Sequence, residues 1–288
     1  MRSANSVAAT ADTVPALSDI GFGARLVSAL VLIPVALAAV VLGWPFFDLL
    51  VLAVGMLMAW EWVRLCSAGR LPTAGLVAIA ATGAAVVAAS FLDTRYVLLI
   101  VAACAVLVAA VAGPLRDPIR LGPLWLGMGV LYAALPCVAI LWLRADPVHG
   151  LATILWLFAL VWAIDSGAYL VGRRVGGPKL APRISPKKTW SGLGGGIIAG
   201  FAVGGIAGML IDGATPLVLA AVSAALAVVE QAGDLGESAL KRRFGAKDSS
   251  GIIPGHGGVL DRIDGLVAVV VVVALLSAAS GGSIVTWQ

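Results

Sequence analysis

Long apolar stretches alternate with short polar segments along nearly the whole chain. About 20 apolar residues cross a bilayer as a helix, and nine stretches approach that length. The pattern therefore predicts an all-α polytopic membrane protein with about nine transmembrane helices. They are expected at residues 24–42, 46–64, 72–91, 95–113, 122–143, 150–171, 192–211, 215–233 and 264–282.

The polar segments divide this pattern into three parts. Residues 1–23 are small and polar and lack the apolar core of a cleavable signal peptide, so we expect a polar cytoplasmic tail. Residues 24–143 are predicted to form helices 1–5 with short loops. Residues 144–288 are predicted to form helices 6–9 and the catalytic part, because they contain two longer polar loops, 172–191 and 234–263.

Basic residues are distributed unevenly between the two sides of the predicted helices. With the N-terminus inside, 17 of the 19 Lys and Arg residues fall on the inner side, and only Arg95 and Arg144 lie outside. Cytoplasmic loops are enriched in Lys and Arg, so the N-terminus is predicted to be cytoplasmic and the C-terminus outside. We expect a multi-pass protein of the inner (cytoplasmic) membrane, with both longer loops facing the cytoplasm.

Composition narrows the class further. Hydrophobic residues make up 61% of the chain and charged residues 12%, whereas soluble domains are nearer a quarter charged. Basic and aromatic residues do not interleave as they do on nucleic-acid surfaces, so no nucleic-acid partner is predicted. The three cysteines include no CxxC pair, which indicates neither a zinc site nor a disulfide framework.

Acidic residues gather at the ends of the last two predicted helices. Glu230, Asp234 and Glu237 recur at helical spacing and share one face if the eighth helix continues beyond the membrane surface. Asp261 and Asp264 begin the ninth helix. Clustered carboxylates repel one another unless a cation lies among them, and Mg²⁺ commonly takes one or two carboxylates plus substrate phosphates. We therefore expect Mg²⁺ here and leave a second cation open.

Basic residues and glycines surround these carboxylates. Lys241, Arg242, Lys247 and Arg262 suit anionic substrate groups, and carboxylates beside cations are typical of phosphoryl or nucleotidyl transfer. The segment PGHGG at 254–258 indicates a tight loop that presents His256 and backbone N–H groups to an anion, because glycine permits close approach to a ligand. The alternative is a simple surface turn.

Polar residues elsewhere allow two readings each. In SPKKT at 185–189, the lysines could bind phosphates, or could only satisfy the positive-inside rule or touch anionic lipid. Asp165 lies at membrane level, which makes it a functional candidate, although pairing with Arg173 or Arg174 would also explain it. Glu61 is interpreted as a partner of Arg64.

The stretch SALKRRFGAKDSSGIIPGHGGVLDRID at 238–264 resembles the signature of the phosphatidate cytidylyltransferases, the CDP-diacylglycerol synthases. Its Ser, Lys-Arg, Lys-Asp, Pro-Gly-His-Gly-Gly and Asp-Arg-x-Asp elements occur in that order. GDLGES, DSGAYLVGRR and SPKKTWSG, all ahead of it, are also similar to segments of this family. Ser191 departs from the family, in which many members are expected to have an acidic residue or Gln there.

The resemblance implies a reaction in which phosphatidic acid attacks CTP, giving CDP-diacylglycerol and pyrophosphate for phospholipid synthesis. CTP, phosphatidic acid and membrane lipids are the implied partners, and a homodimer is left open. Asp234 and Asp261 are the implied main metal ligands, supported by Glu237 and Asp264. The implied catalytic residues are Asp234, Asp261, Lys241, His256 and Arg262.

The substrate-binding residues form a wider set in the same two loops. They are Asp165, Ser185, Lys187, Lys188, Thr189, Ser238, Arg242, Lys247, Asp248, Gly257 and Gly258. Three other functions compete with this reading. A CTP-dependent lipid kinase of the polyprenol or phytol type would release CDP, an ion or solute transporter would need no nucleotide, and an inactive scaffold would show no turnover.

Overall fold

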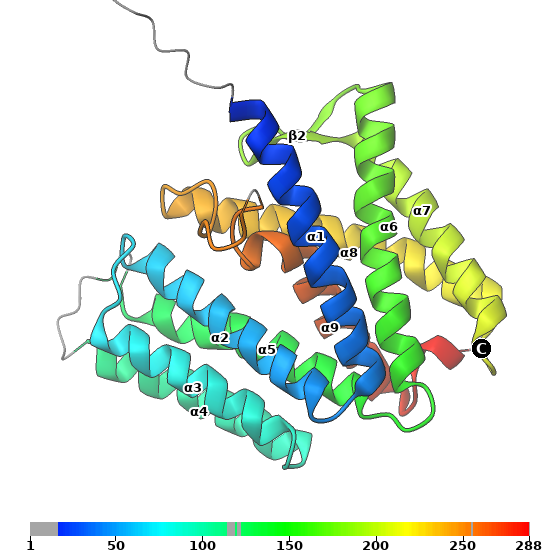
Figure 1. Cartoon of the computed structure of the whole chain (residues 1–288). Coiled ribbons are helices and arrows are strands. Elements are labelled where there is room, and N and C mark those ends of the chain that lie inside the picture. The colour runs from blue at the N-terminus through cyan, green and yellow to red at the C-terminus, as the bar shows by residue number, and fades with distance from the viewer. Residues whose placement is uncertain (1–16, 114–118, 120–121, 255, 288) are drawn as a thin grey trace, which may run out of the picture.

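The computed structural model describes residues 17–113, 119, 122–254 and 256–287, and this part of the chain is mostly helical (Figure 1). The described α-helices are α1 (Leu17–Leu42), α2 (Phe46–Cys66), α3 (Thr73–Ala89), α4 (Thr94–Ala112), α5 (Leu124–Arg144), α6 (Gly150–Val175), α7 (Trp190–Leu210), α8 (Pro216–Arg243) and α9 (Leu260–Ser280). The remaining elements are strands β1 (Lys179–Ala181) and β2 (Ser185–Thr189) and a short 3₁₀ helix, η1 (Ile284–Thr286).

Most of these helices are long and apolar enough to cross a membrane. Seven of the described helices meet that condition. The part Val27–Leu42 of α1 and the whole of α3 (Thr73–Ala89) are apolar but shorter. This confirms a helical polytopic membrane protein. The helix α1 begins at Leu17, ahead of the expected residue 24, because a helix can continue with polar residues beyond its apolar stretch. Residues 1–16 of the predicted tail lie outside the described part of the chain.

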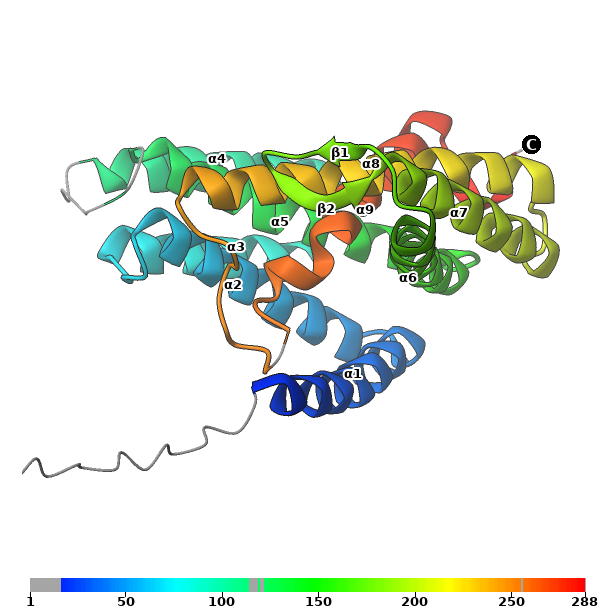
Figure 2. The same ribbon diagram turned by 90° about the horizontal axis from the view of Figure 1, so that it is seen from above.

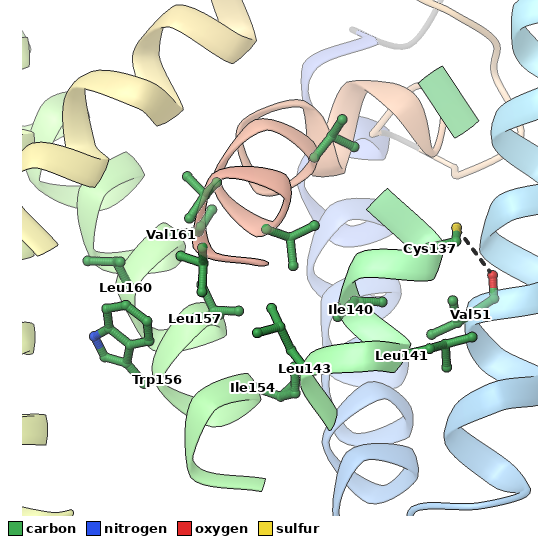
Figure 3. Close-up of a cluster of buried hydrophobic side chains, with 14 of the residues drawn as sticks. Val51, Cys137, Ile140, Leu141, Leu143, Ile154, Trp156, Leu157, Leu160 and Val161 are labelled. Atoms are coloured by element: carbon green, nitrogen blue, oxygen red, sulfur yellow. Dashed lines mark hydrogen bonds between the residues drawn. The ribbon is translucent and has the colours of Figure 1, made fainter. Parts of the chain in front are cut away.

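The helices pack in two neighbouring groups. Helices α2 to α5 contact one another, α6 to α9 contact one another, and α5 also packs on α9 and α6. Figure 3 shows the buried side chains where α5 meets α6 and α2, among them Leu143, Ile154 and Leu157. Cys137 lies in the same core with its Sγ 3.8 Å from the backbone oxygen of Val51. The two halves of the chain therefore share one apolar core.

Small residues bring α7 close to its neighbours. A Cβ atom built on Gly204 would lie 2.5 Å from the backbone oxygen of Leu219 on α8, and one on Gly195 would lie 2.7 Å from the backbone oxygen of Gly167 on α6. Only glycine permits such contacts, and small residues are the usual means of close helix packing in lipid. The glycine-rich seventh helix therefore packs between α6 and α8.

The loop predicted at 172–191 contains a β-hairpin, which the all-α prediction did not include. Helix α6 continues to Val175, and Gly176 and Gly177 turn the chain with φ of 66° and 97°. Strands β1 and β2 then pair antiparallel, with Lys179 opposite Thr189. Figure 2 shows the hairpin lying over α8. The strands are short, so periodicity alone did not distinguish them from a polar loop.

The loop predicted at 234–263 is shorter in the structure. Helix α8 continues to Arg243, and α9 already begins at Leu260. The polar C-terminal part of α8 carries Asp234, Glu237 and Lys241 on successive turns of one helix, as their spacing predicted. The remaining connection, 244–259, reaches from the end of α8 towards α1 (Figure 2).

Candidate active site

The hairpin and α8 meet at an ion pair. Lys188 Nζ lies 2.5 Å from Asp234 Oδ2, with both side chains largely buried. The hydroxyl of Ser238, one turn further along α8, lies 3.3 Å from Asp234 Oδ1 and donates to it. The hairpin and α8 therefore bring together residues that are far apart in the sequence, and Lys188 has a specific partner in Asp234.

Lys241 is the central cation of this region. Its Nζ lies 3.1 Å from Glu237 Oε1, one turn earlier on α8, and 2.5 Å from Asp261 Oδ1 at the start of α9. Lys241 is only 7% exposed and Glu237 only 4%. A buried charge is costly to leave unpaired, so this arrangement holds the ends of α8 and α9 in a defined register.

Asp261 binds Lys241 and also the connection 244–259, which we name the signature loop. Its Oδ2 accepts hydrogen bonds from the backbone N–H groups of Ser249 and Gly258, each at 2.9 Å, and the Ser249 hydroxyl lies 2.9 Å away. The donors of the loop thus gather on Oδ2, whereas among the described residues only Lys241 contacts Oδ1, so a further acceptor position remains on Oδ1. Asp261 is thus placed as an anchor of the loop and of Lys241.

Glu61 also belongs to this region, so its interpretation as a partner of Arg64 was wrong. Its side chain is fully buried and accepts hydrogen bonds from Ser249, Ser250, Val259 and Leu260 at 2.6 to 2.8 Å. Arg64 instead stacks over the ring of Trp60, with its guanidinium carbon 4.8 Å from the ring centroid. Sequence reasoning paired Glu61 with the nearest basic residue, although an acidic residue inside an apolar helix is a functional candidate by default.

Further carboxylates extend the site along α6, α8 and α9. The carboxyl groups of Asp165 and Glu230 are in hydrogen-bonding contact, and Asp165 lies in the field of Asp234, Lys188 and Arg262. Asp264 lies near enough to Asp234 and Asp165 to be repelled by their charges, and its Oδ1 accepts from the N–H of Gly265. The alternative partner of Asp165, Arg173, donates instead to the Tyr169 hydroxyl.

Charge in this region favours a cation. The carboxylates are Asp165, Glu230, Asp234, Glu237, Asp261 and Asp264, and the cationic side chains among them are Lys188, Lys241 and Arg262. Acidic groups outnumber basic ones here, and apart from Asp165 and Glu230, whose hydrogen bond requires a shared proton, they repel one another until positive charge enters. Within the described residues no three His, Cys, Asp or Glu side chains converge on one point as a ready metal cage. Carboxylate oxygens are hard donors of the kind that Mg²⁺ takes, so one or two of these side chains could hold Mg²⁺ if substrate phosphates completed its coordination.

Unsatisfied polar atoms mark where a ligand would bind. Both carboxylate oxygens of Glu237 are buried and make no hydrogen bond within the described structure, despite the ion pair with Lys241. The Nδ1 atom of His256 is buried and likewise without a hydrogen-bond partner there. Buried polar groups are nearly always satisfied, so these atoms are available to a substrate or an ion.

The remaining predicted residues occupy three kinds of place. Thr189 is buried and its Oγ1 caps α7 by accepting from Gly192 N, so its hydroxyl serves the fold. Gly257 has a φ of 91° and pairs with Ile253 in the turn that carries His256, whereas Gly255 lies outside the described residues. The residues at the solvent-accessible margin are Ser185, Lys187, Arg242, Lys247, Asp248 and Arg262.

An apolar cavity of about 450 Å³ opens beside this charged region. Side chains of α1, α2, α5, α6 and α9 line it, together with Ile252 and Ile253 of the signature loop. Its charged lining residues are Asp165 and Arg262, which belong to the carboxylate and cation cluster described above. A polar reaction centre thus borders directly on a space suited to hydrocarbon.

Comparison with known proteins identifies the family of the chain. Residues 23–279 match the model of the cytidylyltransferase family. A protein of Brucella suis named phosphatidate cytidylyltransferase is 39% identical over 260 residues, covering 88% of this chain and 92% of its own. One of the same name from Pseudomonas aeruginosa is 42% identical over 272 residues, covering 89% and 97%. One from Bacillus subtilis is 44% identical over 117 residues, covering 40% and 44%. The chain belongs to the cytidylyltransferase family.

Proposed function

We propose that this membrane enzyme is a phosphatidate cytidylyltransferase, which makes CDP-diacylglycerol and pyrophosphate from CTP and phosphatidic acid. The observation that carries the proposal is the site in which Lys188, Lys241 and Arg262 lie among six carboxylates beside an apolar cavity. The names of the relatives agree with it. Cations for phosphates, carboxylates for a metal and a space for acyl chains are what this reaction requires.

The reaction needs positioning more than it needs a base. An oxygen of the lipid phosphate attacks the α-phosphorus of CTP, a new P–O bond forms, and the bond to the β-phosphate breaks to release pyrophosphate. The lipid phosphate is already anionic at pH 7, so the main obstacle is repulsion between two anionic substrates. Lys188 and Arg262 would lower that repulsion, while Lys241 and His256 would orient phosphate oxygens from α8 and the signature loop.

We assign Mg²⁺ to the carboxylates that retain acceptor capacity. Glu237 has two buried oxygens without hydrogen bonds, and Asp264 interacts electrostatically with both Glu237 and Asp234. Asp261 was predicted as a main ligand, and because it already binds Lys241 through Oδ1 and two N–H groups of the loop through Oδ2, we give it mainly the role of holding Lys241 and the loop. A bound Mg²⁺ would neutralise phosphate charge and stabilise the leaving pyrophosphate. A second cation stays a prediction.

The cavity supports a binding site for the acyl chains of phosphatidic acid. Its walls are apolar over most of their surface, and Arg262 lies where such a ligand would end in its phosphate. Burial of apolar chains there would hold the phosphate at the boundary between membrane and cytoplasm. CTP would approach from the other side, along the hairpin and α8.

We propose a cytoplasmic N-terminus, an outside C-terminus and nine membrane-spanning helices, with the active site facing the cytoplasm of the cell and the protein in its inner membrane. The distribution of Lys and Arg supports this orientation, and CTP is found on that side. The division into residues 24–143 and a catalytic part, 144–288, stays a prediction, as do a homodimer and the absence of a nucleic-acid partner.

Turnover of the purified protein tests the proposed function. In mixed micelles containing phosphatidic acid, α-labelled CTP and Mg²⁺, label is expected to enter the lipid phase as pyrophosphate is released. Excess EDTA is expected to abolish this transfer, and added Mg²⁺ to restore it. Label remaining in water, with CDP formed once a lipid alcohol is supplied, would instead establish a CTP-dependent lipid kinase.

Replacing Lys188 tests how the hairpin contributes. Because its ammonium group is paired with Asp234 and turned toward the site, we expect Lys188→Ala to raise the KM for CTP or phosphatidic acid about 10-fold, near the low end for a lost charged hydrogen bond. Lys179→Ala is the matched control, since Lys179 lies exposed on the other strand of the hairpin. An unchanged KM for both substrates would assign Lys188 only to topology or to lipid contact.

A further inference from the structure

A buried carboxylate of the N-terminal half holds the signature loop. Glu61 lies on α2, far from the catalytic segments in sequence, yet its exposed fraction is 0%. Its Oε1 accepts from the Ser250 hydroxyl at 2.6 Å and from Val259 N at 2.8 Å. Its Oε2 accepts from Leu260 N at 2.8 Å, and the Ser249 hydroxyl lies 2.8 Å away.

These contacts bind both ends of the loop at one point. Ser249 and Ser250 enter the loop, and Val259 and Leu260 leave it at the first turn of α9. One carboxylate therefore closes the intervening segment, which carries His256, into a ring. Because the contacts come from two segments of one loop, neither end can move without breaking a hydrogen bond to Glu61.

Electrostatics explains why an acidic residue is used here. The ion pairs formed by the described residues do not include Glu61, so its charge is balanced by two N–H groups at the start of α9 and by serine hydroxyls. Helix N-termini stabilise anions because their first N–H groups lack partners within the helix. Val259, at the N-cap position, provides no side-chain cap, and Glu61 supplies one from another helix.

Glu61 is also connected, through Ser249, to Asp261 and Lys241 of the candidate active site. The Ser249 hydroxyl lies between Glu61 and Asp261, and Asp261 in turn binds Lys241. A Cβ atom on Gly258 would lie 2.5 Å from Glu61 Oε1 and would also meet the Ser249 hydroxyl. Glycine at 258 is thus required for the loop backbone to approach Glu61.

We propose that Glu61 is a positioning residue for nucleotidyl transfer, which fixes the loop 249–260 and the start of α9 so that His256, Asp261 and Lys241 face the substrates. The inference rests on the proposed function for its catalytic consequence. Glu61 touches no reacting atom in this assignment. It also gives the N-terminal half of the chain a direct part in the active site, beyond anchoring the protein in the membrane.

Glu61→Gln tests this in the full-length protein in mixed micelles. Glutamine has nearly the same shape as glutamate, but its NH₂ group would face the N–H and O–H donors of the loop, so hydrogen bonds to that atom would be lost. We expect kcat to fall about 10–100-fold, the scale for groups that orient a reactive centre. The KM for CTP should change far less, because misplacement costs mainly in the transition state. Hydrogen exchange at residues 249–260 should accelerate while the thermal midpoint stays within about 4 °C of the unsubstituted protein.

Asp48→Asn is the matched control. Asp48 lies at the other end of α2 and accepts from the hydroxyl of Ser90, the C-cap residue of α3, so this variant removes a hydrogen-bonded carboxylate from the same helix without touching the loop. It should leave both kcat and loop exchange unchanged. If Glu61→Gln fails to fold, Ser250→Ala replaces it and should show a smaller change of the same kind, since it removes one of the contacts.

The outcomes separate this inference from the proposed function. Full kcat in Glu61→Gln, or reduced kcat with unchanged exchange at 249–260, would overturn the positioning role. If the unsubstituted protein transfers no label from CTP, the proposed function fails, and the exchange measurement still decides whether Glu61 holds the loop.

Discussion

Asp261→Asn is expected to lower kcat/KM about 10²–10³-fold, the scale for removing a group that places transition-state electrostatics, without preventing membrane insertion. Asparagine has nearly the same shape, but an NH₂ group, which donates, replaces one of the two carboxylate oxygens of aspartate. It would then oppose either Lys241 or the N–H groups of Ser249 and Gly258. The measurement is turnover of label from CTP into lipid, with protein amount in the membrane fraction as the reference.

The control for this variant is Asp212→Asn, at an exposed aspartate between α7 and α8 and outside the site. It should retain full turnover. Near-full activity in Asp261→Asn would show that neither metal binding nor the placement of Lys241 depends on this carboxylate. A variant absent from the membrane fraction would indicate instead that Asp261 is needed for folding.

Glu237→Gln is expected to lower turnover about 10²-fold and to raise the Mg²⁺ concentration needed for half-maximal activity. Glu237 has two buried oxygens without hydrogen bonds in the described structure, and Asp264 lies near it. Because donors of the protein leave these oxygens unsatisfied, Glu237 is well placed to bind a cation. Its amide cannot neutralise a divalent ion. The measurement is the Mg²⁺ dependence of turnover at saturating CTP.

Lys241 supplies the alternative explanation for Glu237. If Glu237 serves only to pair with Lys241, at 3.1 Å, Glu237→Gln would reduce turnover at every Mg²⁺ concentration without shifting the half-maximal value. That result would remove Glu237 from the metal site. Ser238→Ala, on the next residue of α8, is a useful comparison because it removes a contact to Asp234 while leaving Glu237 intact.

The lipid side of the reaction follows from the way the chain folds around α9. Its N-terminal turn carries Asp261, Arg262 and Asp264, whereas its later residues, such as Val267 and Val270, line the apolar cavity. One helix thus leads from the charged cluster into a space for hydrocarbon. A substrate with an anionic head and two acyl chains has the same polarity along its length, which is the physical reason that this site suits phosphatidic acid.

The sequence by itself determined the class of structure and most of the chemical groups. Apolar stretches long enough to cross a bilayer predicted the helices, because the bilayer core fixes the length that an apolar helix must have. Helical spacing placed Asp234, Glu237 and Lys241 on one face of α8, which the structure confirms. The signature at 238–264 indicated the family before any geometry was known, since it contains the residue types of the reaction in order.

Only the tertiary structure decided how those groups are used. Asp261 and Glu237 are both acidic residues near Lys241, yet donors of the loop surround Asp261 and leave Glu237 with unbonded oxygens. Glu61 was assigned to its near neighbour Arg64, whereas its partners lie almost 200 residues away. Such roles depend on the register between distant helices, which is determined by packing and not by the periodicity of any one segment.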